Sequence, residues 1–392
     1  MAVERALSFR DASFSHRKTH SVSLDEASGA VLAETITAKE DRPPRSFATM
    51  DGFCFDAHHS YPLTLVEGSI YPEDDPAPIT PGEAVRIATG APLPPGANAV
   101  LKREEATVDN GTLHGKDISP GTYTYEQGSN MSAGEQLFSA GERLSPKDTL
   151  LLGDLGYDTV TVYEPLSVGL LATGTEIHEG RIRDLDSPML AGLIRSWGHT
   201  VSLEGTVPDE QDIVRDRIEE LANVHDVVMT TGGTSVGKKD YVISALQSLG
   251  TIDFHRVTIR PGKPIAFASL SSQNAVGIAI PGKPVGAHTV ATLVARPFFT
   301  GLTALPTIQA TMQRDVGLGA PAFEYAVPVT VTDGEAMPLG HVDSPLAIYD
   351  ETFDPSVLSS SSRASRADGF VLTTEAIEAG DTVEIIPYFA VE

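Results

Sequence analysis

The rhythm of apolar and polar positions changes near the middle of the chain. Runs such as SVGLLATG, at 167–174, are short and almost wholly apolar, as expected of strands buried on both faces. Segments such as DEQDIVRDRIEELANV, at 209–224, place apolar residues three and four apart, as in an amphipathic helix. The alternation of the two patterns predicts a doubly wound, mainly parallel α/β sheet with sites at the carboxyl ends of its strands. Further strands are predicted over 200–207, 226–233, 253–259 and 274–280, and further helices over 189–198, 240–250 and 286–302.

The chain before this alternation has a different pattern. Short apolar runs separated by Gly- and Pro-rich turns over 53–131 predict a β-rich domain. A helix is predicted over Ser23–Ala33. Another helix is expected to take Ser145 as its N-cap and Pro146 as its first residue.

After Pro306, strands and turns continue to the end and predict a small all-β domain. The serine run 359–362 is interpreted as a loop tip. The fold class is therefore multidomain α/β plus β. The predicted boundaries are 1–40 with 133–165 for an N-terminal linker domain, 41–132 for the β-rich domain, 166–303 for the α/β domain and 304–392 for the C-terminal domain.

The charge balance excludes one class of partner. The 392 residues carry 53 acids against 28 lysines and arginines, a net charge of −25. This acidic charge argues against nucleic acid as a partner, because proteins bind phosphate backbones through basic patches. The acids are spread along the whole chain, which we interpret as a salt-adapted surface of the halophilic kind.

No apolar run approaches the length of a membrane-spanning helix, and the first residues lack the apolar core of a secretory signal. We therefore expect a cytoplasmic protein with no membrane partner. Cys54 is the only cysteine, so an intrachain disulfide and a thiolate zinc or iron–sulfur site are excluded.

Most of the Gly-rich turns of the α/β segment follow a predicted strand. Glycine lets backbone N–H groups approach an anion closely, and a following helix adds the positive end of its dipole. A single turn of this kind has glycine more often for steric reasons alone. Four such turns at one sheet edge, two with Lys and one with Asp, favour a ligand site. The turns are ATGTEIHEG (172–180), TTGGTSVGKKDY (230–241), IRPGKPIAF (259–267) and IAIPGKPVGAH (278–288).

The second turn nearly matches the G-x-x-x-x-G-K motif of nucleotide-binding P-loops. Lys239 stands where the P-loop has the hydroxyl that binds magnesium, so the P-loop interpretation fails on chemistry. The glycine pair with Thr234 and Ser235 instead offers N–H and hydroxyl donors to a phosphate. Asp240 suits a metal ion or a substrate amine, or it is simply a helix N-cap.

Pro-Gly-Lys-Pro occurs twice, and its prolines stiffen the loops that present Arg260, Lys263 and Lys283. In so acidic a chain, this cluster predicts a phosphorylated or oxyanionic ligand. The alternative is three solvated surface cations. Asp51, beside Gly52, reads by itself as a turn residue.

Together these motifs resemble the molybdopterin molybdenumtransferase family, which includes bacterial MoeA and the E domain of gephyrin. The resemblance runs from about residue 20 to the C-terminus, with the motifs in the order and spacing of the family. The matching segments are SFATMDGFCFDA (46–57), RIATGAPLPPGANAV (86–100), LLATGTEI (170–177), DVVMTTGGTSVGKKDYV (226–242), IRPGKPIAFA (259–268), IPGKPVGA (280–287) and ADGFVLTTEAIEAGDTVEIIPY (367–388).

The resemblance implies a four-part elongated subunit with a linker/dimerisation domain, an α/β domain of the molybdopterin-binding type and a C-terminal β-barrel. It implies a homodimer in which the α/β domain of one subunit faces the β-rich domain of its partner. The implied reaction turns adenylylated molybdopterin and molybdate into molybdenum cofactor and AMP, with magnesium as cofactor. A molybdopterin adenylyltransferase is the implied upstream partner.

The resemblance also implies roles for single residues. Asp51 and Thr89 would line the molybdate and adenylate end across the dimer interface, and catalysis would be mainly electrostatic positioning. Catalytic roles are implied for Asp51, Thr89, Asp209, Arg260 and Lys263. Binding of the pterin and its phosphate is implied for Thr173, Gly174, Glu176, Thr231, Gly232, Gly233, Ser235, Gly237, Pro281, Gly282 and Lys283, and of the metal for Glu176 and Asp240.

Several positions depart from the pattern of the family. Arg260 replaces a lysine, which keeps the charge and changes its geometry. Lys283 replaces an asparagine and Lys238 stands at an often acidic position, so both add charge to the anion-facing rim. The other departures are Asn130 for a carboxylate, Pro188 for an asparagine and Ile280 for a leucine.

These departures leave alternatives to the metal-inserting enzyme. One is a paralogue that binds and carries molybdopterin without inserting metal, or that prefers tungstate. Another is a gephyrin-like scaffold. A nucleotide amidohydrolase or pyrophosphatase with a related α/β domain is disfavoured, because the chain also has the first β-rich and the C-terminal domains.

Overall fold

The computed structural model describes residues 2–13, 17–233, 240–270, 275–320 and 322–392. The chain folds into two compact units, Ser21–Val162 (the first unit) and Met1–His20 with Tyr163–Glu392 (the second unit). It passes between them in β1 (Thr19–Ser23) and β12 (Thr159–Tyr163), which pair with each other. The division into four domains stays a prediction.

The two ends of the first unit share a small apolar core. β2 (Ile36–Thr37) pairs antiparallel with β11 (Gln136–Phe138), and α2 (Asp148–Asp154) buries Leu152 in the same core. Leu32 and Val162 are joined by an isolated bridge and are both buried there.

Of the two helices predicted for this unit, the first is absent and the second begins later than predicted. Residues 23–33 form turns and isolated bridges, with Gly29 in the left-handed region at φ +84°. Their apolar side chains are buried by strand partners rather than along a helical face. The later helix begins at Asp148 with Lys147 as its N-cap. Ser145 lies outside it, and its N–H and hydroxyl donate to the Asp148 carboxylate at 2.7 and 2.6 Å.

The remainder of the first unit is β-rich, as predicted. Its six-stranded sheet has the order β7-β4-β6-β5-β9-β8. Neighbouring residues of β4 belong to different cores, Cys54 with Val85 and Phe53 with Leu63, because successive side chains of a strand point to opposite faces. The strands are β4 (Gly52–Phe55), β5 (Leu63–Ile70), β6 (Glu83–Ile87), β7 (Ala99–Lys102), β8 (Thr107–Asp109) and β9 (Thr112–His114), with η1 (Arg103–Glu105) after β7 and the separate pair β3 (Phe47–Ala48) and β10 (Thr124–Tyr125).

The second unit contains the predicted α/β sheet, in the order β14-β13-β15-β19-β18-β16. The pairs β14–β13, β13–β15 and β15–β19 are parallel, whereas β18 runs antiparallel to both of its neighbours. β18 was not among the predicted strands. The strands are β13 (Ser167–Thr173), β14 (Thr200–Val207), β15 (Val227–Thr231), β16 (Thr251–His255), β18 (Ala266–Leu270) and β19 (Ala275–Ile280).

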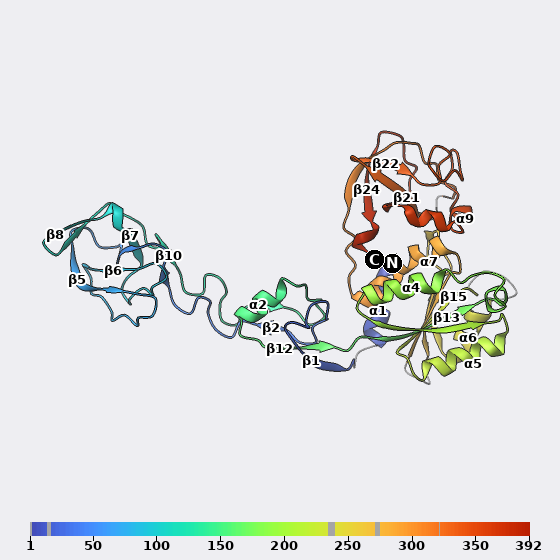
Figure 1. The fold of residues 1–392 in the computed structure, drawn as a ribbon, viewed down its shortest axis with the longest axis horizontal. Helices are drawn as coiled ribbons and strands as arrows, with labels where there is room; N and C mark the ends of the chain where they lie inside the picture. Colours follow the sequence, from blue (N-terminus) through green and yellow to red (C-terminus); the bar gives the residue numbers. More distant parts are fainter. Residues whose placement is uncertain (1, 14–16, 234–239, 271–274, 321) are drawn as a thin grey trace. The chain divides into compact units, whose positions relative to one another are not determined.

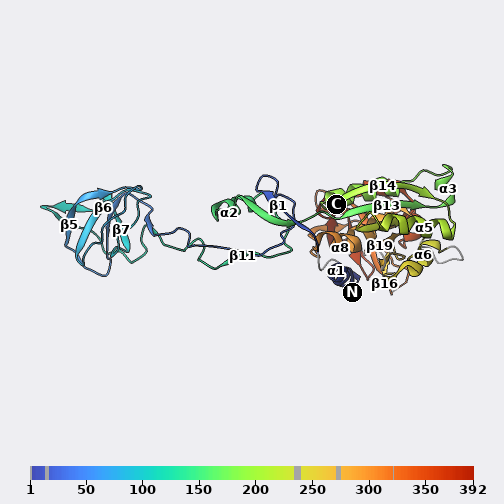
Figure 2. The ribbon, with the colours of Figure 1, turned by 90° about the horizontal axis from the view of Figure 1, so that it is seen from below.

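Helices cover both faces of this sheet, which confirms the doubly wound fold (Figure 1). One face packs against α4 (Asp186–Ser196) and the buried run α7 (Pro284–Val290), η2 (Ala291–Ala295) and α8 (Arg296–Thr300). The opposite face packs against α5 (Gln211–Ala222) and α6 (Tyr241–Leu249). The unpredicted helix α1 (Ala2–Ser13) lies against α8 and buries Ala6 and Phe9 (Figure 2).

A closed five-strand barrel completes the second unit, since β21 pairs with both β22 and β23 in the order β21-β22-β20-β24-β23. One strand from the α/β part, β17 (Ile259–Arg260), extends this sheet beside β21, with Arg260 opposite Tyr325. The barrel elements are β20 (Ile308–Met312), β21 (Glu324–Thr332), β22 (Glu335–Pro338), α9 (Pro355–Leu358), η3 (Ser362–Arg366), β23 (Gly369–Thr373), β24 (Thr382–Pro387) and η4 (Tyr388–Ala390).

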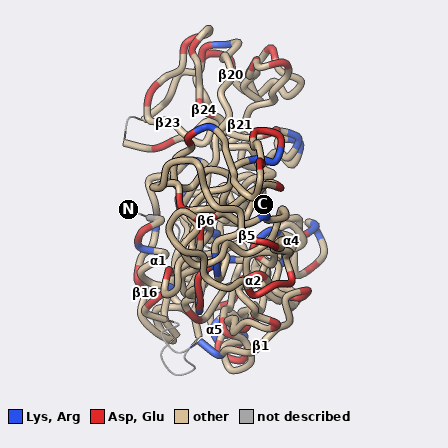
Figure 3. Tube along the Cα trace, turned by 90° about the vertical axis from the view of Figure 1, so that its left-hand side faces the viewer, with Lys and Arg blue, Asp and Glu red and all other residues tan. Residues whose placement is uncertain are grey.

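Acidic residues occur in helices, strands and loops along the whole trace and outnumber the basic ones (Figure 3). Within the described residues, no helix combines the length and apolar character that a bilayer crossing requires.

Candidate functional site

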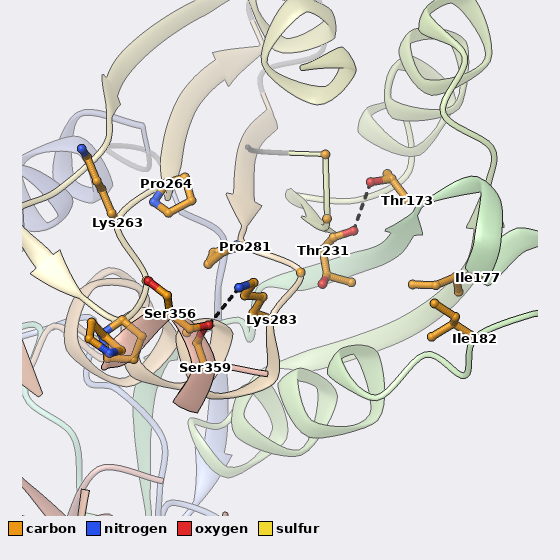
Figure 4. Close-up of a pocket in the computed structure, with 18 of the residues that line it drawn as sticks. Thr173, Ile177, Ile182, Thr231, Lys263, Pro264, Pro281, Lys283, Ser356 and Ser359 are labelled. Carbon is orange, nitrogen blue, oxygen red and sulfur yellow. Dashed lines mark hydrogen bonds between the residues drawn. The ribbon is translucent and has the colours of Figure 1, made fainter. Parts of the chain in front are cut away.

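A pocket of about 650 Å³ lies where the parallel strands of the second unit end (Figure 4). β13 ends at Thr173 and β15 at Thr231, and the register places Thr231 beside Ile280, the last residue of β19. The carboxyl ends of these parallel strands therefore meet at one edge, as the fold requires. The lining residues are Thr173, Gly174, Glu176, Ile177, Ile182, Asp209, Thr231, Gly232, Gly233, Arg260, Pro261, Gly262, Lys263, Pro264, Pro281, Gly282, Lys283, Gly286, Pro355, Ser356 and Ser359.

This pocket brings together residues from all four Gly-rich turns. Asp240 does not line it, and Asp51 and Thr89 belong to the first unit. Thr234, Ser235, Gly237, Lys238 and Lys239 lie outside the described residues. The predicted residues that share the pocket are Thr173, Gly174, Glu176, Asp209, Thr231, Gly232, Gly233, Arg260, Lys263, Pro281, Gly282 and Lys283. Their chemical roles stay predictions.

Glycines let the turns of the pocket floor touch backbone to backbone. Gly232 has φ +90°, and a Cβ there would lie 2.5 Å from the carbonyl oxygen of Thr173. A Cβ on Gly282 would lie 3.0 Å from the Cα of Gly232. The Gly232 N–H donates to the Ile280 carbonyl at 3.1 Å, which ties the second turn to the fourth. Side chains at these positions would force the turns apart.

Three cations form one end of the pocket. Arg260 lies in β17, and its guanidinium carbon is 3.8 Å from the ring centre of Phe323, just before β21. The ammonium of Lys263 is 5.2 Å from the same ring. Both contacts are within the range of cation–π attraction, which orients a cation without neutralising it.

Lys283 is held differently. Its Nζ donates a 3.0 Å hydrogen bond to the backbone carbonyl of Ser356, in the first turn of α9. The charge that Lys283 was predicted to add to the rim stays a prediction, because a bond to a neutral carbonyl does not remove it. The ammonium also ties the fourth turn to the barrel.

Two carboxylates lie at the other end. Glu176 belongs to the short helix α3 (Thr175–His178), and Asp209 follows β14. The Asp209 N–H donates to the Thr175 hydroxyl at 3.0 Å, which fixes the two segments beside each other. Ile177 and Ile182 add apolar surface, on the side of the pocket away from Lys263 and Lys283 (Figure 4). The pocket thus offers cations at one end and carboxylates with apolar surface at the other.

The oxygen donors of this end fit a magnesium ion. Among the described residues, no group of three or more His, Cys, Asp or Glu side chains could hold a metal ion. Mg²⁺ is usually held by one or two carboxylates, with water and substrate phosphates as its remaining ligands. Glu176 and Asp209 supply that number of carboxylates on one pocket wall.

Asp240 occupies the N-cap position of α6. One carboxylate oxygen is buried without a hydrogen-bond partner. Burial raises the pKa of the group, while the charges of His255 and Arg256 and the backbone N–H of Ile243 oppose that rise. Ile243 is the third residue of α6, where an N-cap side chain accepts its hydrogen bond, so the capping alternative stays open.

Sequence reasoning missed a buried acid behind the pocket floor. Asp186 starts α4 and is 5% exposed, and it accepts a 3.0 Å hydrogen bond from the Thr231 hydroxyl. Its other carboxylate oxygen is buried without a partner, and burial raises its pKa to about 6. Pro188 lies in the first turn of α4, where a missing N–H breaks no helical hydrogen bond.

The barrel wall of the pocket was also missed. Pro355, Ser356 and Ser359 line it from α9 and the residue that follows. Ser359 is only 4% exposed, whereas Ser360 and Ser362 are exposed, so the interpretation as a loop tip fails for the first residue of the serine run. Nothing local marks these residues, because their approach to the pocket depends on how the barrel docks.

In the first unit, the two motifs around Asp51 and Thr89 come together. Thr89 donates to one Asp51 oxygen from its N–H at 2.7 Å and from its hydroxyl at 2.8 Å. These hydrogen bonds, and to a lesser degree the charge of Arg103, lower the pKa of Asp51. Both side chains are exposed, so the pair presents a fixed carboxylate to solvent.

Asn130 also belongs to the first unit. Its backbone N–H donates to the Arg42 carbonyl at 3.0 Å.

Comparison with known proteins gives one consistent result. The family model described as "MoeA N-terminal region (domain I and II)" matches residues 1–156, and the one described as "Probable molybdopterin binding domain" matches residues 169–301. The molybdopterin molybdenumtransferase of Haemophilus influenzae is 30% identical over 286 residues, 69% of either chain. That of Synechococcus elongatus is 31% identical over 297 residues, 70% of this chain and 73% of its own.

The crystal structure of a molybdopterin biosynthesis MoeA protein from Pyrococcus horikosii superposes with a TM-score of 0.72 at 27% identity and covers 98% of both chains. The predicted fold class and the predicted family are thereby confirmed. The two matched domains and the relatives at this identity show that the chain belongs to the molybdopterin molybdenumtransferase family, a family of transferases in molybdenum cofactor biosynthesis.

Proposed function

We propose that this protein inserts molybdenum from molybdate into adenylylated molybdopterin and releases AMP. The single observation that carries the proposal is the pocket itself, which joins four glycine-rich turns with three cations and two carboxylates. A pterin phosphate and an adenylate require backbone donors at close range, and an oxyanion such as molybdate requires uncompensated positive charge. Both requirements are met at one edge of one sheet.

The residues would act by binding and positioning. Gly233 would offer its backbone N–H to the pterin phosphate. Thr231 and Gly232 would hold it in position, since the Thr231 hydroxyl donates to Asp186 and the Gly232 N–H to the Ile280 carbonyl. Arg260 and Lys263 would hold the oxyanion. Oriented charges in a partly enclosed site stabilise the charge that develops in a transition state without having to reorganise. The relevant groups are oriented before a ligand arrives, because Phe323 fixes the cations and the glycine contacts fix the turns.

Magnesium would be held by Glu176 and Asp209 together with phosphate oxygens of the substrate, and would neutralise negative charge there. The role assigned to Asp240 by the resemblance is a further proposal, supported by its orphaned carboxylate oxygen and not by membership of the pocket.

We further propose that the working form is a homodimer in which Asp51 and Thr89 of the partner subunit complete the site. The support is that the hydrogen-bonded pair is exposed, and that it belongs to the first unit whereas the pocket belongs to the second. A molybdopterin adenylyltransferase would supply the adenylylated substrate.

The reaction is tested by incubating the protein with adenylylated molybdopterin, magnesium and either molybdate or tungstate. AMP release and cofactor formation are then measured for the wild type and for Asp51→Ala. The wild type is expected to turn over, and the variant to lose at least about 100-fold in kcat while still binding the pterin, because it lacks an oriented charge. Tight binding without AMP release by the wild type would instead identify a carrier or a scaffold.

The shared site is tested by mixing subunits. Asp51→Ala and Lys263→Ala subunits would each be inactive alone. Random mixing should restore about a quarter of the wild-type activity, since half of the dimers are hybrids with one intact site of two. No recovery in a mixture shown to contain hybrids would place Asp51 and Lys263 in the same subunit's site or remove Asp51 from it.

A further inference from the structure

The fourth turn and helix α9 are joined at two points. Besides the bond from Lys283 to the Ser356 carbonyl, the Val285 N–H donates to the Ser359 carbonyl at 3.1 Å. The Val285 side chain packs in the core of the barrel, beside Leu358. The Lys283 side chain and the Val285 backbone thus donate hydrogen bonds to carbonyls at opposite ends of α9.

α9 has little to hold it in place by itself. It is four residues long, far shorter than a helix that is stable in water. Asp354 caps its start by accepting from the N–H groups of Ser356 and Val357 at 2.9 and 3.2 Å, and Leu358 anchors its far side in the barrel core. On the side that faces the pocket, α9 is held by its two hydrogen bonds with the fourth turn.

We propose that Lys283 is a positioning residue that holds α9 as a fixed wall of the pocket. A lysine suits this task because its long stem reaches the Ser356 carbonyl from an exposed loop, while the ammonium keeps further donors for an anion. The asparagine that the resemblance leads one to expect has neither the reach nor the charge. This departure therefore couples the anion-binding turn to the barrel.

The consequence for binding rests on the proposed function. A ligand in the pocket meets Pro355, Ser356 and Ser359 as one of its walls. If the tether is lost, α9 opens more often and the ligand-competent form is less populated, which raises KM. Bound substrate reacts as before, so kcat changes little.

The test compares Lys283→Met, Lys283→Arg and the matched control Lys263→Met by hydrogen–deuterium exchange of the peptide 354–361. Lys283→Met removes the donor and the charge, and Lys283→Arg keeps both. Lys263→Met removes a pocket cation that lies over Phe323 and leaves the hydrogen bond to Ser356 in place. Lys283 is exposed, so these substitutions leave the core intact.

Exchange in Lys283→Met is expected to be roughly threefold to tenfold faster than in the wild type, as for the loss of one hydrogen bond of typical net strength, and unchanged in the other two variants. The KM for molybdate should rise by a similar factor with kcat within about twofold. Unchanged exchange in Lys283→Met, or an equal increase in Lys263→Met, overturns the proposal. If the wild type releases no AMP, the proposed function fails, whereas the exchange measurement still decides the role of Lys283.

Discussion

Replacing Asp186 by asparagine should change how the free energy of unfolding depends on pH. The carboxylate is 5% exposed and one of its oxygens has no hydrogen-bond partner. Burial raises its pKa from 3.8 to about 6, the hydrogen bond from Thr231 opposes this rise, and the charge of Asp184 adds to it. The folded protein thus binds this proton more tightly than the unfolded chain does.

The sign and size of the effect follow from linkage. A raised folded-state pKa makes the ionised group a penalty that is fully present above about pH 6 and disappears as the pH falls to about 4. A shift from 3.8 to about 6 corresponds to about 3 kcal/mol. The stability of Asp186→Asn relative to the wild type should therefore rise by up to about 3 kcal/mol between pH 4 and pH 7.

The measurement is urea unfolding of both proteins at fixed salt between pH 4 and pH 7.5, with the difference plotted against pH. Carboxylates that do not interact with Asp186 cancel in this difference, so Asp184 is the one neighbour whose own titration also changes. A buried amide adds only a pH-independent offset. The free energy of unfolding of Thr231→Val relative to the wild type should fall as the pH rises from 4 to 7. In this variant the Asp186 carboxylate loses the hydrogen bond that lowers its pKa. A difference that stays flat across this range would refute the assignment of Asp186 as a strained buried acid.

Three further outcomes can be checked on the same protein. With a net charge of −25, Tm should rise between 0.1 and 1 M KCl as the Debye length falls from about 10 to about 3 Å, and a falling Tm would rule out the salt-adapted surface. Gly232→Ala should cost about 1–3 kcal/mol and weaken pterin binding, since it strains a φ of +90°, whereas Gly192→Ala, which meets no atom within 4 Å, should be neutral or stabilising in a melt. Arg260→Lys and Phe323→Leu should each raise the KM for molybdate severalfold without adding in the double variant; additive effects would show that the two do not act as a pair.

The α/β part was predictable because its signal is long and repeated. β14 was placed at its observed bounds, and α5 and α6 within two residues of theirs. β18 was missed because it follows the IRPGKP turn directly, and an apolar run that short does not reveal its own secondary structure. α1 was missed because its stability comes from Ala6 and Phe9 docking on distant helices, which no local pattern records.

The candidate site divides in the same way. The local pattern of glycine and lysine in each turn predicts an anion site, and the parallel topology brings the residues of these turns to one edge of the sheet. Asp186, Phe323 and the α9 wall could not be found by this route. Each owes its place to a contact with a residue far along the chain, such as that of Asp186 with Thr231 or of Phe323 with Arg260.

Arg260 and Lys283, two residues that differ from the pattern expected for the family, both contact the barrel. The Arg260 guanidinium lies over the Phe323 ring, a contact for which a planar guanidinium is better suited than an ammonium. Lys283 bonds to the Ser356 carbonyl, which an asparagine could not reach. Both contacts run from a glycine-rich turn of the pocket to the barrel, so both side chains contribute to the same interface. Charge in this pocket is thus coupled to the docking of the barrel, and a substitution that loosens that docking should weaken anion binding even where it leaves every cation in place.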